Sequence, residues 1–320
     1  MLIIAGANRR NHFVTKLRHH SLLKRRTEKK RVIVKMRVYD AATYLPIRHF
    51  GWPNGGSMNG TTLTPDQMTA LAQSQATKLR VVRKVLPPVI GNGYVGSVPG
   101  RRVHKGPVLG VRPNQHLPAM QISRHFVLQR EQNNDSNTVT TLINFAAADI
   151  ALAEDAVVLL GSEAAHILHR LHIKLDNEDE LQHQEGLLRK EHPHVDQPIL
   201  DSILDGIRTL RERGQNGDYY VIVSPDLYEE AYKNKHSPLD APIYQINALL
   251  ANQGFLYSEA TPPKTGVILS LARNTISLSV PMDTYIDTSL PNDADGRTML
   301  AVAEQFRLVI NDPEARAELR

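Results

Sequence analysis

Cysteine is absent from the 320-residue sequence, and so is any long uninterrupted apolar run. The lack of cysteine excludes disulfide bonds and thiol chemistry, and it fits a reducing cytoplasm. The most apolar stretch, Leu142 to Leu160, is interrupted by Asp149, Glu154 and Asp155, whereas a membrane helix needs about 20 predominantly apolar residues. The apolar start is followed by basic residues, the reverse of the order in a secretory signal. We therefore expect a cytoplasmic protein with no membrane segment.

Catalytic signatures are missing as well. The sequence contains no nucleophile elbow, P-loop or HExxH motif. Residues 91–96 match GxGxxG, but Pro87-Pro88 precede them and Pro99-Gly100 follow. Nucleotide binding needs a strand before this motif and a helix after it. We interpret the motif as a glycine turn and expect neither an enzyme nor a cofactor.

Two groups of ionisable residues could be mistaken for sites. Three histidines have the spacing HxxHxxH, but the outer two lie about 240° apart around a helix, so three ligands cannot share one face. A solvated face is therefore favoured over a metal site for His166, His169 and His172. Three acidic residues are expected on the polar face of a long helix, with one or two pairing to arginine across a subunit contact. These are Asp149, Glu154 and Asp155.

Positive charge is concentrated at the start of the sequence. Residues 1–37 hold twelve Lys or Arg against the single acid Glu28, so they carry +11. The whole chain carries +5, which leaves −6 on the remainder. Three interpretations stay open: an arm that neutralises nucleic-acid phosphates, a solubilising tail, or, if Met36 is the true start, no arm at all. With the Gly/Asn-rich stretch 51–60, residues 1–62 are expected to be a flexible arm and linker.

Helical signals begin at residue 63. Thr64, Pro65 and Gln67 form a capping box with proline at the first helical position, which predicts a helix over 63–86. Apolar residues at spacings of three and four predict a spine helix of about 22 residues from Val139 to Leu160. The histidine-rich stretch 162–197 has the composition of a polar insertion. A further helix is predicted from Pro198 to about Gly214.

Strand signals occupy other parts of the chain. Residues 87–118 predict an extended loop or two-stranded ribbon, and residues 120–128 alternate as a half-buried strand does. A central strand is predicted at 219–223. The last 60 residues are mostly strand, with strict alternation from Leu300 to Ile310. Because helices and strands fall into separate blocks, the fold class is predicted to be α+β.

Several short motifs in this order carry a family resemblance. They are Leu63-Thr64-Pro65, the strand Pro118–Ile122, the helix end Ala153-Glu154-Asp155 and, most specifically, Glu304–Ala315. Together they resemble an encapsulin, a shell protein of the linocin-like bacteriocin family related to the major capsid proteins of tailed phages. The resemblance covers residues 63–320, about four-fifths of the chain.

The resemblance implies a phage major-capsid-like fold. It assigns an N-terminal helix to 63–86 and an extended loop to 87–118. A peripheral domain with the spine helix is implied for 119–214 and an axial domain for 215–292. A C-terminal strand, 293–320, then returns to the peripheral domain.

The resemblance also implies a function. Such a chain self-assembles into an icosahedral shell of about 60 or more copies, which encloses a cargo enzyme such as a ferritin-like protein or a dye-decolourising peroxidase. In relatives the N-terminal helix faces the interior beside a groove that binds a C-terminal cargo peptide. The matching positions here are Met68, Leu71 and Leu79. The implied pore loop contains Lys233, Asn234, Lys235, His236 and Asp240.

A second hypothesis remains beside the nanocompartment. A phage or prophage capsid protein that packages nucleic acid would have the same fold, and the basic arm would serve it.

Overall fold

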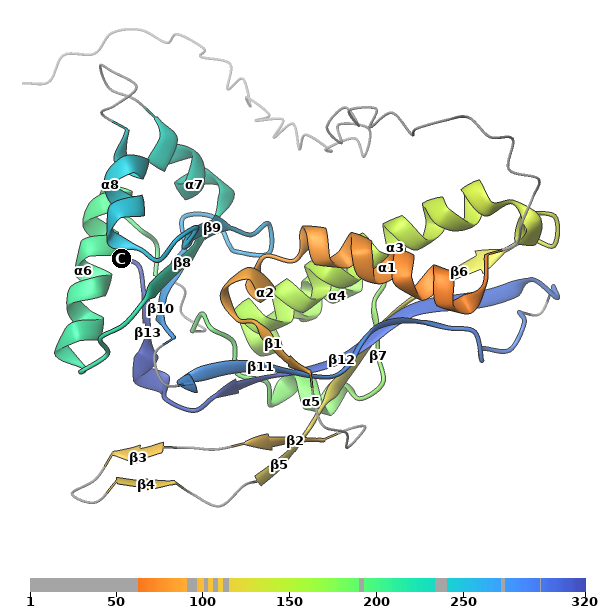
Figure 1. Ribbon diagram of the computed structural model, residues 1–320, viewed down its shortest axis with the longest axis horizontal. Helices are drawn as coiled ribbons and strands as arrows, with labels where there is room; N and C mark the ends of the chain where they lie inside the picture. The colour runs from red at the N-terminus through yellow and green to blue at the C-terminus, as the bar shows by residue number, and fades with distance from the viewer. Residues whose placement is uncertain are drawn as a thin grey trace, which may run out of the picture. The chain divides into compact units, whose positions relative to one another are not determined.

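The computed structural model describes residues 63–90, 97–100, 103–105, 109–111, 115–189, 193–233, 241–271, 274–293 and 295–320. The larger of its two main sheets has five strands in the order β1-β11-β12-β6-β7 (Figure 1). These strands are β1 (Pro88–Ile90), β6 (Met120–Leu128), β7 (Lys174–Leu175), β11 (Ile276–Asp287) and β12 (Thr298–Ile310). Only the β1–β11 pair in this sheet is parallel.

Two long helices lie side by side over this sheet, α1 (Pro65–Leu79) and α3 (Ser136–Leu160) (Figure 1). The predicted capping box is confirmed: the Gln67 N–H donates to Thr64 Oγ1 (3.3 Å), and the Thr64 N–H donates to Gln67 Oε1 (2.9 Å). The predicted spine helix is α3, which begins three residues earlier than expected. Its N-cap is Asp135, whose Oδ1 accepts from the Asn137 N–H (3.1 Å). No helix in the described ranges is long and apolar enough to cross a bilayer.

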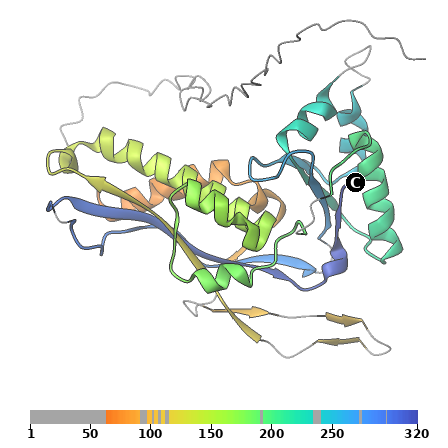
Figure 2. The ribbon, with the colours of Figure 1, turned by 180° about the vertical axis from the view of Figure 1, so that it is seen from behind.

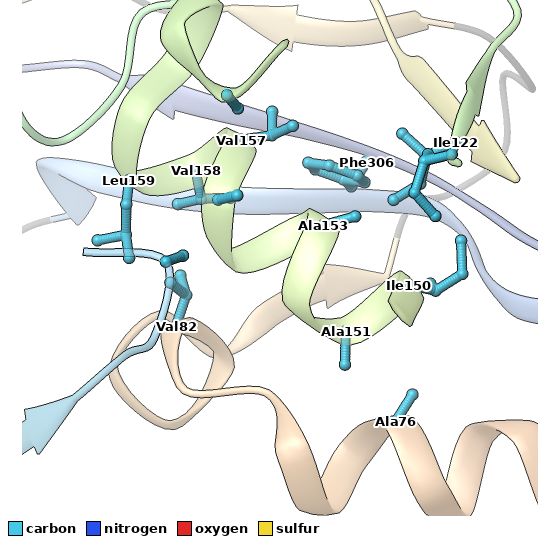
Figure 3. Packing of buried hydrophobic residues seen from close by; sticks show 14 of the residues in the cluster. Ala76, Val82, Ile122, Ile150, Ala151, Ala153, Val157, Val158, Leu159 and Phe306 are labelled. Carbon is cyan, nitrogen blue, oxygen red and sulfur yellow. The ribbon is translucent and has the colours of Figure 1, made fainter. Parts of the chain in front are cut away.

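Small residues let α1 and α3 approach closely. Ala76 of α1 and Ala151 of α3 are both buried and face one another in Figure 3. On its sheet side, α3 places apolar side chains over β6 and β12, where Ile122 and Phe306 are fully buried. Burial of apolar area contributes roughly 25 cal/mol per Å², so this shared core is the main attraction between helices and sheet.

The helix predicted over 63–86 is interrupted. The first helix ends at Leu79, Arg80 adopts an extended conformation (φ −61°, ψ 125°), and a short α2 follows at Val82–Val85. The prediction was wrong at Arg80 because this side chain turns into the protein, where it is fully buried. The end of the helical region before Pro87 is as predicted.

Strand β12 differs from the alternation expected of it. Ten consecutive residues of the strand, 300–309, are buried. Helix α3 covers one face, and on the other Arg307 Nη1 lies 3.1 Å from Glu180 Oε2 in α5 (Glu178–Gln182). A strand covered on both faces does not need to alternate in exposure, so the alternating side chains mark two buried faces.

The histidine-rich stretch is not simply a polar insertion. It contains α4 (Ala165–Arg170), β7 and α5, and most of its apolar residues join the main core. The Leu187 and Leu188 N–H groups donate to the Val158 and Leu159 carbonyls (2.9 and 2.8 Å). A helix leaves its last carbonyls without partners, so this segment completes the C-terminal end of α3.

The second main sheet has four strands in the order β13-β10-β8-β9. They are β8 (Tyr219–Val223), β9 (Phe255–Tyr257), β10 (Gly266–Ser270) and β13 (Arg316–Glu318). Its helices are α6 (Ile199–Glu212), α7 (Pro225–Tyr232) and α8 (Pro242–Leu249), which share a separate buried cluster with it. Strand β8 lies between two neighbours, so its prediction as a central strand is confirmed.

The elements are grouped differently from the ranges assigned to the peripheral and axial domains. Helix α6, within 119–214, packs with the four-stranded sheet, whereas β11, within 215–292, is a strand of the five-stranded sheet. Strand β13 joins the four-stranded sheet, although it follows β12 of the other sheet. The chain crosses between the sheets several times, so ranges that are continuous in sequence cannot describe them.

The ribbon predicted within 87–118 is present in two parts (Figure 2). Strand β2 (Ser97–Gly100) pairs with β5 (Gln115–Pro118), and β3 (Val103–Lys105) pairs with β4 (Leu109–Val111). Both pairs are antiparallel. The start of the predicted loop, however, is β1, which belongs to the five-stranded sheet.

Gly161, at the end of α3, provides a test of this packing. It has φ +60° and ψ −128°, and a Cβ there would lie 2.5 Å from the Gly186 nitrogen. We expect Gly161→Ala to destabilise the protein by more than about 3 kcal/mol, because backbone strain and overlap add. Gly214 has φ +75° but no atom near its Cβ position, so Gly214→Ala should cost only about 1–2 kcal/mol. Equal losses in chemical denaturation would contradict the close packing at Gly161.

Candidate functional site

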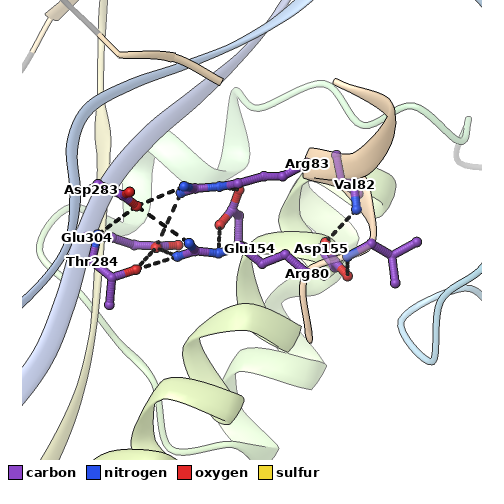
Figure 4. A network of polar contacts seen from close by, with 9 residues as sticks. Arg80, Val82, Arg83, Glu154, Asp155, Asp283, Thr284 and Glu304 are labelled. Atoms are coloured by element: carbon purple, nitrogen blue, oxygen red, sulfur yellow. Dashed lines mark hydrogen bonds and ion pairs between the residues drawn. The ribbon is translucent and has the colours of Figure 1, made fainter. Parts of the chain in front are cut away.

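A group of buried charges joins the two long helices to the five-stranded sheet (Figure 4). Arg80 Nε lies 2.5 Å from Glu154 Oε2 of α3. The other end of the same guanidinium bonds to Glu304 of β12. All three side chains are completely buried. Thr284 of β11 donates to Glu304 Oε2 (3.0 Å), and its hydroxyl oxygen accepts from Arg80 Nη2 (2.5 Å).

Arg83 in α2 extends this buried charge cluster toward the surface. Its Nε lies 2.7 Å from Glu154 Oε1, and its Nη1 lies 2.8 Å from Asp283 Oδ1 in β11. Burial acts to raise the pKa of Asp283, but Arg83, the Thr284 N–H and Arg80 together hold that pKa below its ordinary value. Burial and the neighbouring Glu154 raise the pKa of Glu304 well above its ordinary value. The two arginines thus bridge carboxylates from three different elements.

Asp155, next to Glu154 in α3, holds the start of α2. Its two carboxylate oxygens accept from the Val81 and Val82 N–H groups (2.9 and 3.0 Å). Burial raises the pKa of Asp155 to about 7, even though both backbone N–H groups and Arg80 favour the charged form. Because no solvent or substrate reaches Arg80, Glu154 or Glu304, we interpret the cluster as a structural joint and not as a catalytic site.

The three acidic residues expected on the polar face of the spine helix all have partners within the same chain. Glu154 and Asp155 are buried, and their partners belong to the same chain. Asp149 pairs with Arg124 of β6 (2.9 Å), also within the chain. The expected pairing across a subunit contact was therefore wrong for Glu154 and Asp155, which are buried, and it stays a prediction for Asp149. Polar residues on an amphipathic helix normally face solvent, so the sequence pattern alone could not reveal a buried partner.

The three residues matched to the cargo groove do not have equivalent positions. Met68 is only 8% exposed and belongs to the core, Leu71 is partly buried against it, and Leu79 is 44% exposed. Phe145 of α3, which is 63% exposed, was not among the predicted contact residues. It is an apolar residue that does not fall at the spacings of the predicted apolar face of the spine helix. Such a residue off the buried face is the sequence signal that could have indicated an exposed apolar contact.

The predicted pore loop is described only at its first residue. Lys233 is exposed and directly follows the last residue of α7, whereas Asn234, Lys235, His236 and Asp240 lie outside the described residues. Four aromatic rings pack together near the end of α7, and one of them, Tyr232, directly precedes Lys233 in the chain. Tyr228 packs against Tyr232, Phe255 and Tyr257, with ring centroids 5.0, 5.3 and 4.7 Å away. This group was not foreseen, because its members come from α7 and β9.

The other sequence motifs give no site in the described part of the chain. The side chains of His166, His169 and His172 are exposed. Among the described residues, no three His, Cys, Asp or Glu side chains are placed to hold a metal ion. The glycine motif at 91–96 lies outside the described residues.

Comparison with known proteins gives consistent matches. The family model Linocin_M18, described as "Encapsulating protein for peroxidase", matches residues 90–306. The type 1 encapsulin shell protein EncA of Myxococcus xanthus is 30% identical over 117 residues, which is 36% of this chain and 39% of that protein. The alignment thus spans well under half of this relative's length.

Two solved structures show the fold. A virus-like particle from Pyrococcus furiosus matches with a TM-score of 0.55 and 14% identity, covering 80% of this chain and 98% of its own. The capsid of Myoviridae phage XM1 matches with a TM-score of 0.50 and 12% identity, covering 75% and 91%. At such low identities these matches establish an α+β, phage-capsid-like fold and nothing finer.

The raised pKa of Asp155 predicts how stability depends on pH. Its carboxyl binds a proton more tightly in the folded state, with a pKa of about 7 against 3.8 when unfolded, so this group's contribution to stability falls as pH rises between those values. From about pH 5 to about pH 7 the loss should be about 2–3 kcal/mol. Glu304 acts in the same direction. Asp155→Asn should flatten this part of the profile, and Asp201→Asn, an exposed change in α6, should not.

The profile is measured by chemical denaturation at fixed protein concentration. A wild-type profile that rises between pH 5 and 7, or one that Asp155→Asn leaves unchanged, would contradict the assignment.

Proposed function

Since this chain belongs to the Linocin_M18 family of encapsulating proteins, we propose that it is the self-assembling shell subunit of an encapsulin nanocompartment. The family match, which covers more than half of the chain, is the observation that carries the proposal. The capsid-like fold supports it. In this role the chain builds a container and performs no catalysis of its own. The lack of cysteine in the sequence fits a shell in the cytoplasm.

Several features suit a subunit that is completed by its neighbours. Strands β3 and β4 pair only with each other in the described sheets, and an isolated two-stranded ribbon is marginally stable in water. Val89 and Ile90 of the edge strand β1 are 58% and 67% exposed. Exposed apolar residues on a sheet edge favour association. We propose that further copies of this chain cover these segments in an icosahedral shell.

Assembly is tested on the purified full-length protein by size-exclusion chromatography with light scattering and by negative-stain microscopy. We expect hollow, closed particles of about 60 or more subunits. A monomer or a small oligomer would contradict the shell. The ratio of absorbance at 260 and 280 nm separates the alternative hypothesis, because particles filled with nucleic acid would favour a capsid that packages it through the basic arm.

The proposed cargo is an enzyme, and a peroxidase is the first to test because the matching family is described as encapsulating one. A ferritin-like protein is the alternative. We place the cargo contact on the outer side of α1 and α3, at Leu79 and Phe145, whose exposed fractions leave apolar surface available. We leave Met68 out of the proposed contact, because its side chain already contributes to the core.

Cargo binding is tested with Leu79→Glu, which places a charge on the proposed apolar contact. Co-expression with a cargo peroxidase that carries its C-terminal peptide should give at least about tenfold weaker capture, equivalent to about 1.4 kcal/mol. The matched control is Leu204→Glu on α6, where the leucine is similarly exposed (40%). Peroxidase per shell is measured by densitometry on particles of normal size. Equal loss in both variants, or in neither, would contradict a cargo contact at Leu79.

A further inference from the structure

We propose that a cavity between α6 and β13 binds a small oxyanion of the phosphate type. The cavity has a volume of about 200 Å³. Arginines from four places in the sequence line it, together with the hydroxyl residues Ser202 and Thr209. The arginines are Arg189, Arg213, Arg316 and Arg320. This inference concerns a ligand of the subunit itself and is independent of the proposed shell function.

Arg316 of β13 is the central group of this cavity. Its side chain is almost entirely buried, with Nη1 donating to the Gly186 carbonyl and Nη2 bonding to Glu185. Its Nε–H is buried and has no acceptor among the described residues. A buried donor without an acceptor costs about 1–3 kcal/mol, more when it is charged. An anion in the adjoining cavity would place its negative charge beside this guanidinium, although the Nε atom itself has no exposed surface.

The two acidic side chains on the lining already have donors. Asp205 accepts from Gln197 Nε2 (3.3 Å) and lies 3.2 Å from Arg208 Nη1. Glu318 Oε1 accepts from the Arg189 N–H. Arg208 balances part of the charge of Asp205, whereas the backbone donor of Glu318 occupies one of its oxygens without neutralising it. The lining therefore keeps an excess of guanidinium groups.

Arg213 and Arg320 provide cationic groups that solvent can reach. Both residues are exposed. Arg213 donates through Nη1 to the Arg316 carbonyl (3.0 Å), which holds it beside the cavity, and a guanidinium has five N–H donors in all. Ser202 donates to the Arg320 carbonyl (2.7 Å), which holds the backbone of that residue against α6.

The volume and the donors decide the class of ligand. Sites for drug-sized molecules usually enclose about 300–1,000 Å³, so this cavity suits a small ion better than a nucleotide. Guanidinium groups match oxyanions through paired, charge-assisted hydrogen bonds. A tetrahedral oxyanion can accept from several guanidiniums at once, whereas chloride has neither its geometry nor its charge.

The test is isothermal titration calorimetry of the purified full-length protein, in its native assembly state, with sodium phosphate and with sodium chloride at matched ionic strength. We expect one phosphate per chain with a dissociation constant at or below about 1 mM and no saturable chloride heat. Phosphate should also raise the melting temperature. Absence of saturable phosphate binding, or equal binding of chloride, would overturn the proposal.

Two variants locate the site. Arg213→Gln should weaken phosphate binding at least about tenfold, and because Arg213 is exposed, the variant should still fold. Arg170→Gln, an exposed arginine in α4 that does not line the cavity, is the matched control and should bind as the wild type does. Phosphate binding that survives in Arg213→Gln, or that both variants lose equally, would overturn the assignment to this cavity.

Discussion

The burial of Arg80 between Glu154 and Glu304 is the constraint on which the arrangement of α1, α3 and the five-stranded sheet depends. A buried charge without a partner costs several kcal/mol. Arg80 lies between α1 and α2. One carboxylate, Glu154, comes from α3, and the other, Glu304, comes from β12, the middle strand of the five-stranded sheet. Each charge is tolerated only when the other two elements are in place. The cluster therefore favours a single arrangement of the layers, which general apolar packing would specify less strictly.

This internal joint bears on the proposed shell. A closed shell repeats the same contacts around every symmetry axis, so the surfaces that meet must be presented by a body of defined shape. The charge cluster and the closure of α3 by Leu187 and Leu188 provide such a body. The β3–β4 ribbon and the exposed edge strand β1 lie outside this core, where they remain available to neighbouring copies.

Local signals in the sequence predicted individual helices and strands, but they did not predict which of these elements contact one another. The capping box at Thr64, the spine helix and the central strand at 219–223 depend on neighbouring residues, and all three were predicted correctly. The pairing of Arg80 with Glu304 spans 224 positions, and no periodic pattern relates two such distant residues. The crossing of the chain between the sheets at α6, β11 and β13 was missed for the same reason. Exposure of Leu79 and burial of Met68 depend on how α1 packs against α3 and β11, which sequence spacing cannot resolve.

A double-mutant cycle between Arg80 and Glu304 tests the role of the charge cluster most directly. Arg80→Met, Glu304→Gln and the double variant are compared with the wild type by chemical denaturation at one pH and one protein concentration. We predict a coupling energy of about 1–3 kcal/mol, with the double variant less destabilised than the sum of the single changes. Effects that add within about 0.5 kcal/mol would contradict the claim that these two buried charges depend on each other.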